Sequence, residues 1–282
     1  MSIANFIPTV WSDKIFTRLR KTLVFQGLCN TDYEGEIKDF GDVVKINEIG
    51  PIAVNSYTGA EISWEALDDA SKELKIDQKK YFAFAVDDVD RAQAKGNLID
   101  GASKEAAYAM GDTIDQAIAA LYADAGVHND TNLGVADTSV SCSVANVISR
   151  FAYMGQYLDE ANVPRGDRWA AIPPWVHRVL VMAEVAGVAT YTPMAGAELI
   201  TKTGFIGQAL GFNIFMSNNV STDDTEWRTL FGNRSAISLA FQIVKTKSVE
   251  RESYFDEGIK GLVVYGKKVV RPNALGCAYL KV

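Results

Sequence analysis

Residues 72–86 read KELKIDQKKYFAFAV, and this stretch says most about the fold. Its apolar residues of one parity are Leu74, Ile76, Phe82, Phe84 and Val86. Because the residues between them are mostly polar or small, the stretch has the period-2 pattern of a β-strand. A strand of this length would span ~50 Å, whereas a compact globule of this chain length has a radius of gyration of only ~19 Å. The pattern therefore predicts a strand that projects from the body.

A partner strand is expected just before it. The segment DVVKINEI at 42–49 reads as a strand, and Gly50-Pro51 ends it. The polar stretch that follows contains Tyr57 and Trp64. The two strands together predict a long hairpin that extends away from the rest of the molecule.

A long helix is expected after the hairpin. Asp87, Asp88 and Asp90 favour the start of a helical region, because acidic side chains there oppose the helix dipole. Beyond Gly96, apolar and small residues recur at spacings of three and four: Leu98, Ala102, Ala106, Met110, Ile114, Ala117, Ile118 and Leu121. This spacing predicts an amphipathic helix that ends near Gly126.

The rest of the chain mixes helices and strands. Helices are predicted at 143–161 and 174–186, and strands at 168–172, 226–249 and 259–270. Residues 204–215 read as a helix or turn that leads into a strand, and 217–226 as a polar loop. The fold class is therefore predicted to be α+β.

Composition narrows the function. The chain has 282 residues, is 48% hydrophobic, and carries a net charge of −7 with no block of Lys or Arg. Nucleic-acid binders usually present a basic face, because phosphate contacts supply most of their affinity. The charge therefore argues against a dedicated DNA-binding protein, but it is compatible with a container that holds DNA without gripping it.

The sequence offers no local signature of a disulfide, a zinc site, a membrane span or a secretory signal. Cys29, Cys142 and Cys277 are far apart and odd in number. No uncharged apolar run approaches the ~20 residues that a membrane helix needs. Residues 1–11 lack the basic and apolar regions of a signal peptide. We therefore expect the protein to fold in a reducing cytoplasm.

One literal motif suggests nucleotide binding. Gly261, Gly266 and Lys267 spell G-x-x-x-x-G-K, the phosphate-binding loop. Lys268 stands where Ser or Thr should bind magnesium, and the intervening residues 262–265 read as strand. The motif is therefore predicted to be part of a strand.

Other candidates for chemistry are equally weak. The only histidines, His128 and His177, have no local pairing with a cysteine that would indicate a nucleophilic site. The acidic clusters lack the spacing of a calcium loop and fit helix caps and solvated loops. We therefore predict no catalytic, cofactor-binding or metal-binding residue.

Aromatic residues in the projecting segments are the candidate inter-subunit contacts. Residues 1–32 form an apolar arm without an obvious local partner, and it contains Phe6, Trp11 and Phe16. Tyr57 and Trp64 lie in the predicted hairpin. Aromatic side chains often anchor interfaces, so we expect these five to contact other subunits. For Trp11, burial within its own chain is an equally good alternative.

These segments resemble the major capsid proteins of tailed bacteriophages. The arm and first hairpin strand correspond to ANFIPTVWS at 4–12, LVFQGLCNTDYEGEI at 23–37 and GDVVKINEIGPI at 41–52. The second strand and long helix correspond to IDQKKYFAFAVDDVDRAQA at 76–94 and AAYAMGDTIDQAIAALYADAG at 106–126. The closing strands correspond to FDEGIKGLVVYGKKVVRPNAL at 255–275. Together the segments cover about half of the chain in the family's order and spacing.

The resemblance implies the Hong Kong 97 fold and a domain division. It places the N-terminal arm at 1–32 and an extended hairpin, the E-loop, at 33–86. It places the peripheral P-domain, which contains the long spine helix, at 87–135 and 240–282, and the axial A-domain at 136–239.

The resemblance also implies function and partners. The chain would assemble with itself into hexamers and pentamers of an icosahedral shell around double-stranded DNA, without an enzymatic activity or a cofactor. A portal, a separate scaffolding protein and a decoration protein are further expected partners, and no membrane is involved. The protein would reside in the virion, and in the host cytoplasm before assembly.

Two alternatives stay open on the sequence. An encapsulin-like cellular nanocompartment shell has a related fold but encloses cargo enzyme instead of a genome. A soluble hydrolase belongs to a different class and requires a convergent polar site, which the sequence does not show. The contents of purified particles would separate the two shell functions.

Overall fold

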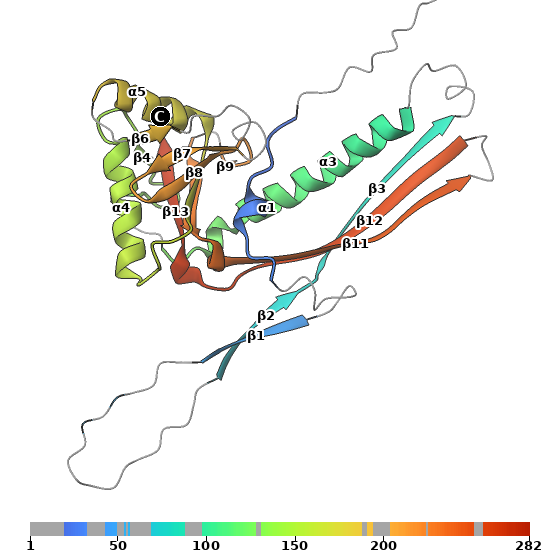
Figure 1. Ribbon diagram of the computed structural model, residues 1–282, viewed down its shortest axis with the longest axis horizontal. Coiled ribbons are helices and arrows are strands. Elements are labelled where there is room, and N and C mark those ends of the chain that lie inside the picture. The colour runs from blue at the N-terminus through green and yellow to red at the C-terminus, as the bar shows by residue number, and fades with distance from the viewer. Residues whose placement is uncertain are drawn as a thin grey trace, which may run out of the picture.

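The computed structural model describes residues 20–32, 43–49, 54, 56, 69–87, 98–127, 131–187, 191–193, 204–223, 225–250 and 256–282. It shows an elongated α+β subunit (Figure 1), with a body at one end, a long sheet and helix at the other, and a two-stranded hairpin that points away from both. The predicted fold class is confirmed.

The body is built on an eight-stranded mixed sheet. Its main path runs in the order β4 (Val140–Ser141), β13 (Leu275–Lys281), β10 (Trp227–Asn233), β5 (Arg168–Ile172), β8 (Phe212–Met216), β7 (Phe205–Ala209) and β6 (Tyr191–Pro193), with β9 (Ser221–Thr222) paired to β10. The helices α4 (Val147–Glu160) and α5 (Pro174–Val185) pack around it. Phe151, Phe212 and Phe231 meet edge to face in the core.

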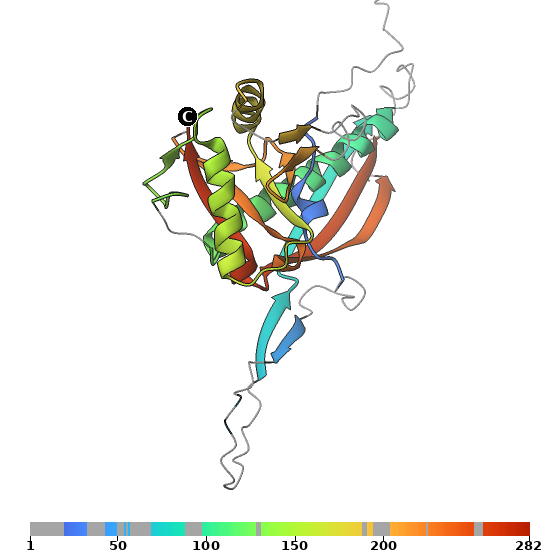
Figure 2. The ribbon, with the colours of Figure 1, turned by 60° about the vertical axis from the view of Figure 1, so that its left-hand side comes forward.

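The elongated end is a three-stranded antiparallel sheet with one long helix. The strands lie in the order β11 (Ile237–Glu250), β12 (Asp256–Val269) and β3 (Gln78–Asp87). The helix α3 (Leu98–Ala119) runs along this sheet (Figures 1 and 2) and continues as the 3-10 turn η3 (Ala120–Asp124). The predicted long amphipathic helix is therefore confirmed over its described residues.

The literal phosphate-loop motif lies within β12, as the sequence predicted. Gly261 and Gly266 are strand residues. The Lys267 ammonium donates a hydrogen bond to the carbonyl oxygen of Ala117 in the last turn of α3. A cation at this end of a helix satisfies a free carbonyl and opposes the helix dipole. Lys267 therefore caps the C-terminal end of α3.

The projecting hairpin pairs β1 (Val43–Ile49) with β2 (Asp69–Lys75) in antiparallel register, from Val43 opposite Lys75 to Ile49 opposite Asp69. A lone two-stranded ribbon is marginally stable in water, so its base needs anchors. Leu74 and Ile76 are buried in a small apolar cluster with residues of β11 and β12. The Lys72 ammonium also donates a 2.6 Å hydrogen bond to the carbonyl oxygen of Val270.

The single strand predicted over 72–86 is wrong in one respect, because the structure divides it between two sheets. The strand β2 ends at Lys75, and β3 begins at Gln78 as a partner of β12. Side-chain parity continues through Ile76, so the alternation cannot reveal the change of partner. A Cβ added at Gly266 would collide with the carbonyl oxygen of Lys75. The segment between β2 and β3 therefore passes close over β12 at Gly266, where a larger residue would block it.

A second correction concerns residues 204–215. The helix alternative is wrong, because these residues form the hairpin of β7 and β8. Its turn residues Leu210 and Gly211 have φ values of 48° and 82°. Two successive positive φ values are typical of the two-residue turn that joins twisted antiparallel strands.

Several other predicted elements are confirmed within a few residues, but the helical start predicted at Asp87 is wrong, because Asp87 is the last residue of β3, and Asp88 and Asp90 lie outside the described residues. The strand at 168–172 is β5, and the helices at 143–161 and 174–186 are α4 and α5. The strand region 226–249 holds β10 and most of β11.

Candidate assembly surfaces

The five residues predicted to contact other subunits lie outside the described part of the chain. They are Phe6, Trp11 and Phe16 in the arm and Tyr57 and Trp64 in the hairpin. The candidate assembly surfaces among the described residues are the base of the arm, the base of the hairpin and the three-stranded sheet.

The base of the arm runs along the spine helix of its own chain. Arg20 forms a 3.0 Å ion pair with Glu105, and its guanidinium lies 5.2 Å from the centroid of the Tyr108 ring. The Tyr108 hydroxyl accepts a 2.7 Å hydrogen bond from the backbone N–H of Lys21. These contacts fix the direction of the arm base along α3.

Residues 24–28 then enter the core of the same chain. Val24 is buried, and so are Phe25 and Leu28 of the short helix α1 (Phe25–Leu28). The described base of the arm therefore packs on its own chain, and the predicted contacts of Phe6, Trp11 and Phe16 with other subunits stay a prediction. Apolar residues in a sequence indicate that their side chains will be buried, but they do not indicate whether the same chain or another one buries them.

A buried carboxylate anchors this base. Asp115 of α3 is fully buried, and its Oδ1 accepts hydrogen bonds from the backbone N–H groups of Val24 (3.1 Å) and Gln26 (3.3 Å). Burial raises the pKa of the Asp115 carboxyl above its ordinary value, while hydrogen bonds from Asn219 and the arm backbone act in the opposite direction. The arm base is therefore held by polar groups as well as by apolar burial.

The three-stranded sheet leaves part of one face uncovered. Lys267 reaches α3, so residues that share its parity lie on the helix side of β12. The opposite face carries a row in which Lys247 of β11 stands opposite Lys260 of β12, which stands opposite Ala83 of β3. Both lysines are exposed, and Tyr81 on the same face is 78% exposed. These residues line a shallow hollow of about 450 Å³.

Two lysines placed directly across a ladder repel each other and destabilise the pair. Within the described residues, neither Lys247 nor Lys260 has an acidic partner in an ion pair. An exposed aromatic ring beside unpaired basic groups is the chemistry of a surface that accepts an acidic, apolar segment.

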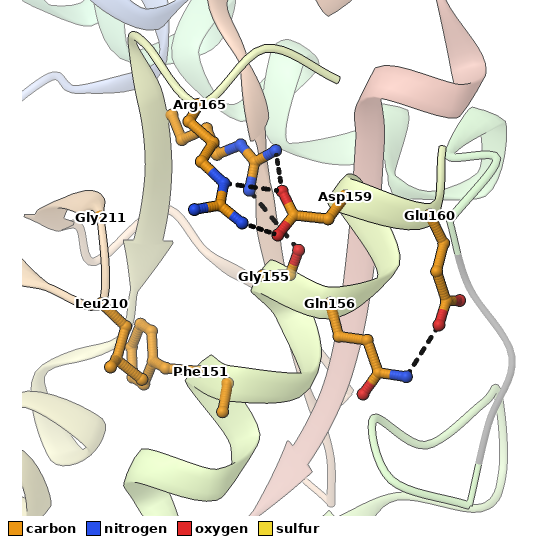
Figure 3. Close-up of a pocket in the computed structure, with 10 residues that line it drawn as sticks. Phe151, Gly155, Gln156, Asp159, Glu160, Arg165, Leu210 and Gly211 are labelled. Atoms are coloured by element: carbon orange, nitrogen blue, oxygen red, sulfur yellow. Dashed lines mark hydrogen bonds and ion pairs between the residues drawn. The ribbon is translucent and has the colours of Figure 1, made fainter. Parts of the chain in front are cut away.

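A second hollow lies in the body between α4 and the β7–β8 turn (Figure 3), with a volume of about 590 Å³. The Asp159 carboxylate in it accepts hydrogen bonds from Arg165 (2.8 Å) and the buried Arg168 (2.7 Å). The bonds from Arg165 and Arg168 hold the pKa of Asp159 below its ordinary value. The carboxylate is therefore ionised and fully engaged, and it ties the 161–167 loop to α4 instead of offering a base.

The titratable side chains of the described residues do not gather into a metal-binding cluster. These residues contain no group of three or more His, Cys, Asp or Glu side chains that could hold a metal ion. His177 is half-buried on α5, where burial lowers its pKa, and His128 lies outside the described residues. No described helix is long and apolar enough to cross a membrane.

The three thiols should not react with a thiol reagent while the protein is folded. All three are buried and free, and burial raises the pKa of Cys142 to about 11, of Cys277 to about 12, and of Cys29 further in the same direction. Only the thiolate is nucleophilic, and at neutral pH these groups stay protonated. A colorimetric titration should count no fast thiol in native buffer and three in denaturant. A fast-reacting thiol in the folded protein would contradict this assignment.

Comparison with known proteins gives a consistent result. A family model described as phage capsid protein matches residues 69–279. A structure from Mycobacterium phage Che8 is 28% identical with a TM-score of 0.78, and the match covers 98% of each chain. No curated protein sequence matches the chain.

Two more distant structures share the fold. The capsid of the cyanophage P-SCSP1u is 17% identical with a TM-score of 0.76, over 99% of this chain and 94% of that one. The mature capsid of bacteriophage PhiM1 is 12% identical with a TM-score of 0.70, over 98% and 92%. The family match spans the base of the hairpin, the spine helix and both sheets. The chain therefore belongs to the phage capsid protein family, and it is a major capsid shell protein with a Hong Kong 97-type fold.

Proposed function

We propose that this subunit assembles with copies of itself, as hexamers and pentamers, into an icosahedral shell that encloses a double-stranded DNA genome and performs no catalysis. The observation that carries the proposal is the shape of the subunit (Figure 1), whose hairpin extends beyond the body and whose described anchors lie at its base. A hairpin that projects in this way is suited to contact a neighbouring subunit. Electron microscopy of the purified protein tests the proposal, with closed particles expected and only soluble monomers contradicting it.

The strand pairing supports a refined domain division. We assign β3 to the P-domain together with α3, β11 and β12, because β3 pairs with β12. We assign β13 to the A-domain, because it pairs with β10 in the body sheet. The E-loop then ends near Lys75 instead of residue 86, and the closing strands divide between the two domains.

We propose that the E-loop of one subunit lies on the uncovered face of the P-domain sheet of the next. Between Lys45 and Lys72 the sequence carries five acidic residues and no Lys or Arg: Glu48, Glu61, Glu65, Asp68 and Asp69. The uncovered face carries Lys247 and Lys260 beside exposed Tyr81. Opposite charge and shared apolar character make the two surfaces complementary.

We further propose which partners the shell has and where its subunits reside. A portal, a separate scaffolding protein and possible decoration proteins would act with the shell, and subunits would occupy the host cytoplasm before they enter the virion. The role of a shell subunit, which family membership gives this chain, supports these proposals. Particles that contain cargo enzyme instead of DNA would favour the nanocompartment alternative.

The unassembled subunit should bind duplex DNA weakly, with a Kd no tighter than the ~10⁻⁶ M limit typical of non-specific binding at physiological salt. The net charge of −7 repels a polyanion on average. Arg20 and Lys21, two basic groups that could have faced the genome, are occupied by Glu105 and Asn219. Retention of the genome would then come from closure of the shell. A gel-shift titration tests this, and submicromolar binding would show that the subunit grips DNA.

A further inference from the structure

The arm base and a loop of the body meet at the same buried carboxylate. The Oδ1 atom of Asp115 accepts the two N–H groups of the arm, and its Oδ2 accepts a 3.0 Å hydrogen bond from Nδ2 of Asn219. Asn219 follows β8 in the body sheet and is 6% exposed. Three segments far apart in the sequence are therefore joined at one side chain of the spine helix.

The network closes on itself through the arm. The Oδ1 atom of Asn219 accepts a 3.0 Å hydrogen bond from the Lys21 ammonium, and its Nδ2 also donates to Asp112 at 2.7 Å. Lys21 lies 3.9 Å from the Asp112 carboxylate. Every polar atom of the Asn219 amide is thus used, with its oxygen turned to the arm and its nitrogen to the helix.

Apolar contacts join the same three parts. A Cβ added at Gly204 would lie 2.7 Å from a Val24 methyl carbon, so the arm base packs directly on the start of β7. The Gly204 carbonyl accepts a 2.7 Å hydrogen bond from the N–H of Met216, at the end of β8. The loop at 217–220 follows at once. Movement of the arm base would therefore disturb both strands of this hairpin.

We propose that Asp115 and Asn219 form a coupling junction through which the arm and the 217–220 loop of the body stabilise each other. Loss of one partner leaves a buried charge or amide without its hydrogen bonds, which costs more than the bond itself. Coupling of this kind is reciprocal. The role of the junction in assembly rests on the proposed function. A neighbouring subunit that binds the arm would then also order the 217–220 loop of the subunit whose arm it binds.

Hydrogen exchange in the unassembled full-length subunit tests the junction in both directions. Asn219→Ala should raise the exchange rate of the Val24 and Gln26 amides on the order of tenfold, the size expected for a lost hydrogen bond to a charged group. Lys21→Ala should raise the exchange rate of the backbone N–H of Asn219, which donates a 3.1 Å hydrogen bond to the Ser217 hydroxyl. Each substitution is thus read out about two hundred positions away in the sequence.

Matched controls separate coupling from general loosening. Among the described residues, Arg20→Ala removes contacts with Glu105 and Tyr108 and none with Asn219, so it should leave exchange in 217–220 unchanged. Thr225→Ala lies in the same body region and bonds Asp223, so it should leave the arm amides unchanged. If Asn219→Ala does not fold, the half-exposed Lys21 still carries the test.

Two outcomes would overturn the proposal. One is faster exchange only next to each substitution, and the other is equal loosening by the junction variants and their controls. Reciprocal changes in a subunit that fails to form shells would support the junction while contradicting the proposed function. The two proposals can therefore fail separately.

Discussion

Replacing residues 50–68 with an Asn-Gly turn should leave a folded subunit that has lost nearly all capacity to form closed shells. The ladder pairs Ile49 with Asp69, so a two-residue turn fits directly between them. The anchors at Lys72, Leu74 and Ile76 are kept. The body core should therefore be unaffected, because the change keeps both hairpin strands and the anchors at their base.

Two measurements separate folding from assembly in this variant. Thermal unfolding should shift by no more than a few degrees, and sedimentation should show small oligomers in place of particles. A full-length variant with Tyr57→Ser and Trp64→Ser serves as the comparison, because it removes the predicted aromatic contacts and keeps the length of the loop. Normal particles from the shortened hairpin would show that the E-loop has no intermolecular role.

The sequence predicted individual elements well because their signals are local. Pro174 marks the first turn of α5, and the apolar run at 168–172 coincides with β5. The order and spacing of such segments also carried the family resemblance. Alternation in 72–86 correctly indicated strand over most of its length, because β2 and β3 each have one face that is more covered than the other.

Partner choice was not predictable, because periodicity reports a buried face and not the identity of the element that buries it. Ile76 keeps the parity of Phe82 while the chain passes from one sheet to another. Val24 and Phe25 read as apolar arm residues, yet they fill the core of their own chain. In each case the missing information is a contact between residues far apart in the sequence.

The Asp115 junction did leave one trace in the sequence. An acidic residue stands beside Ile114 and within one turn of Ile118, in the stripe that faces the core. Lys, Glu, Arg and Asp are almost never fully buried without a partner, so such a residue indicates a specific donor set. Its donors at Val24 and Asn219 could not be identified, because they lie about one hundred positions away on either side.

Exchanging charges between the E-loop and the P-domain sheet should first block assembly and then restore it. Lys247→Glu with Lys260→Glu places two acidic groups opposite an acidic loop, and Glu61→Lys with Glu65→Lys places basic groups opposite a basic face. Each pair of changes should sharply reduce particle yield. The variant with all four changes returns the net charge to −7 and should recover most of it.

The expected effect is large because many weak charge interactions add up over the shell. One exposed ion pair contributes only ~0.2–1 kcal/mol, but every subunit of a shell would make the contact, and reversal adds repulsion to the lost attraction. Assembly of the native protein should also weaken as salt rises, because exposed charges are screened within about 8 Å at physiological ionic strength. Light scattering against salt concentration measures this for each variant.

The control carries the same change of charge on other surfaces. Lys104→Glu on α3 with Lys281→Glu at the end of β13 alters the net charge equally but touches neither proposed partner. It should assemble in far higher yield than the double change at Lys247 and Lys260. If the fourfold variant stays unassembled although its subunit folds, the loop and the sheet do not face each other, and Lys247 and Lys260 must serve another surface.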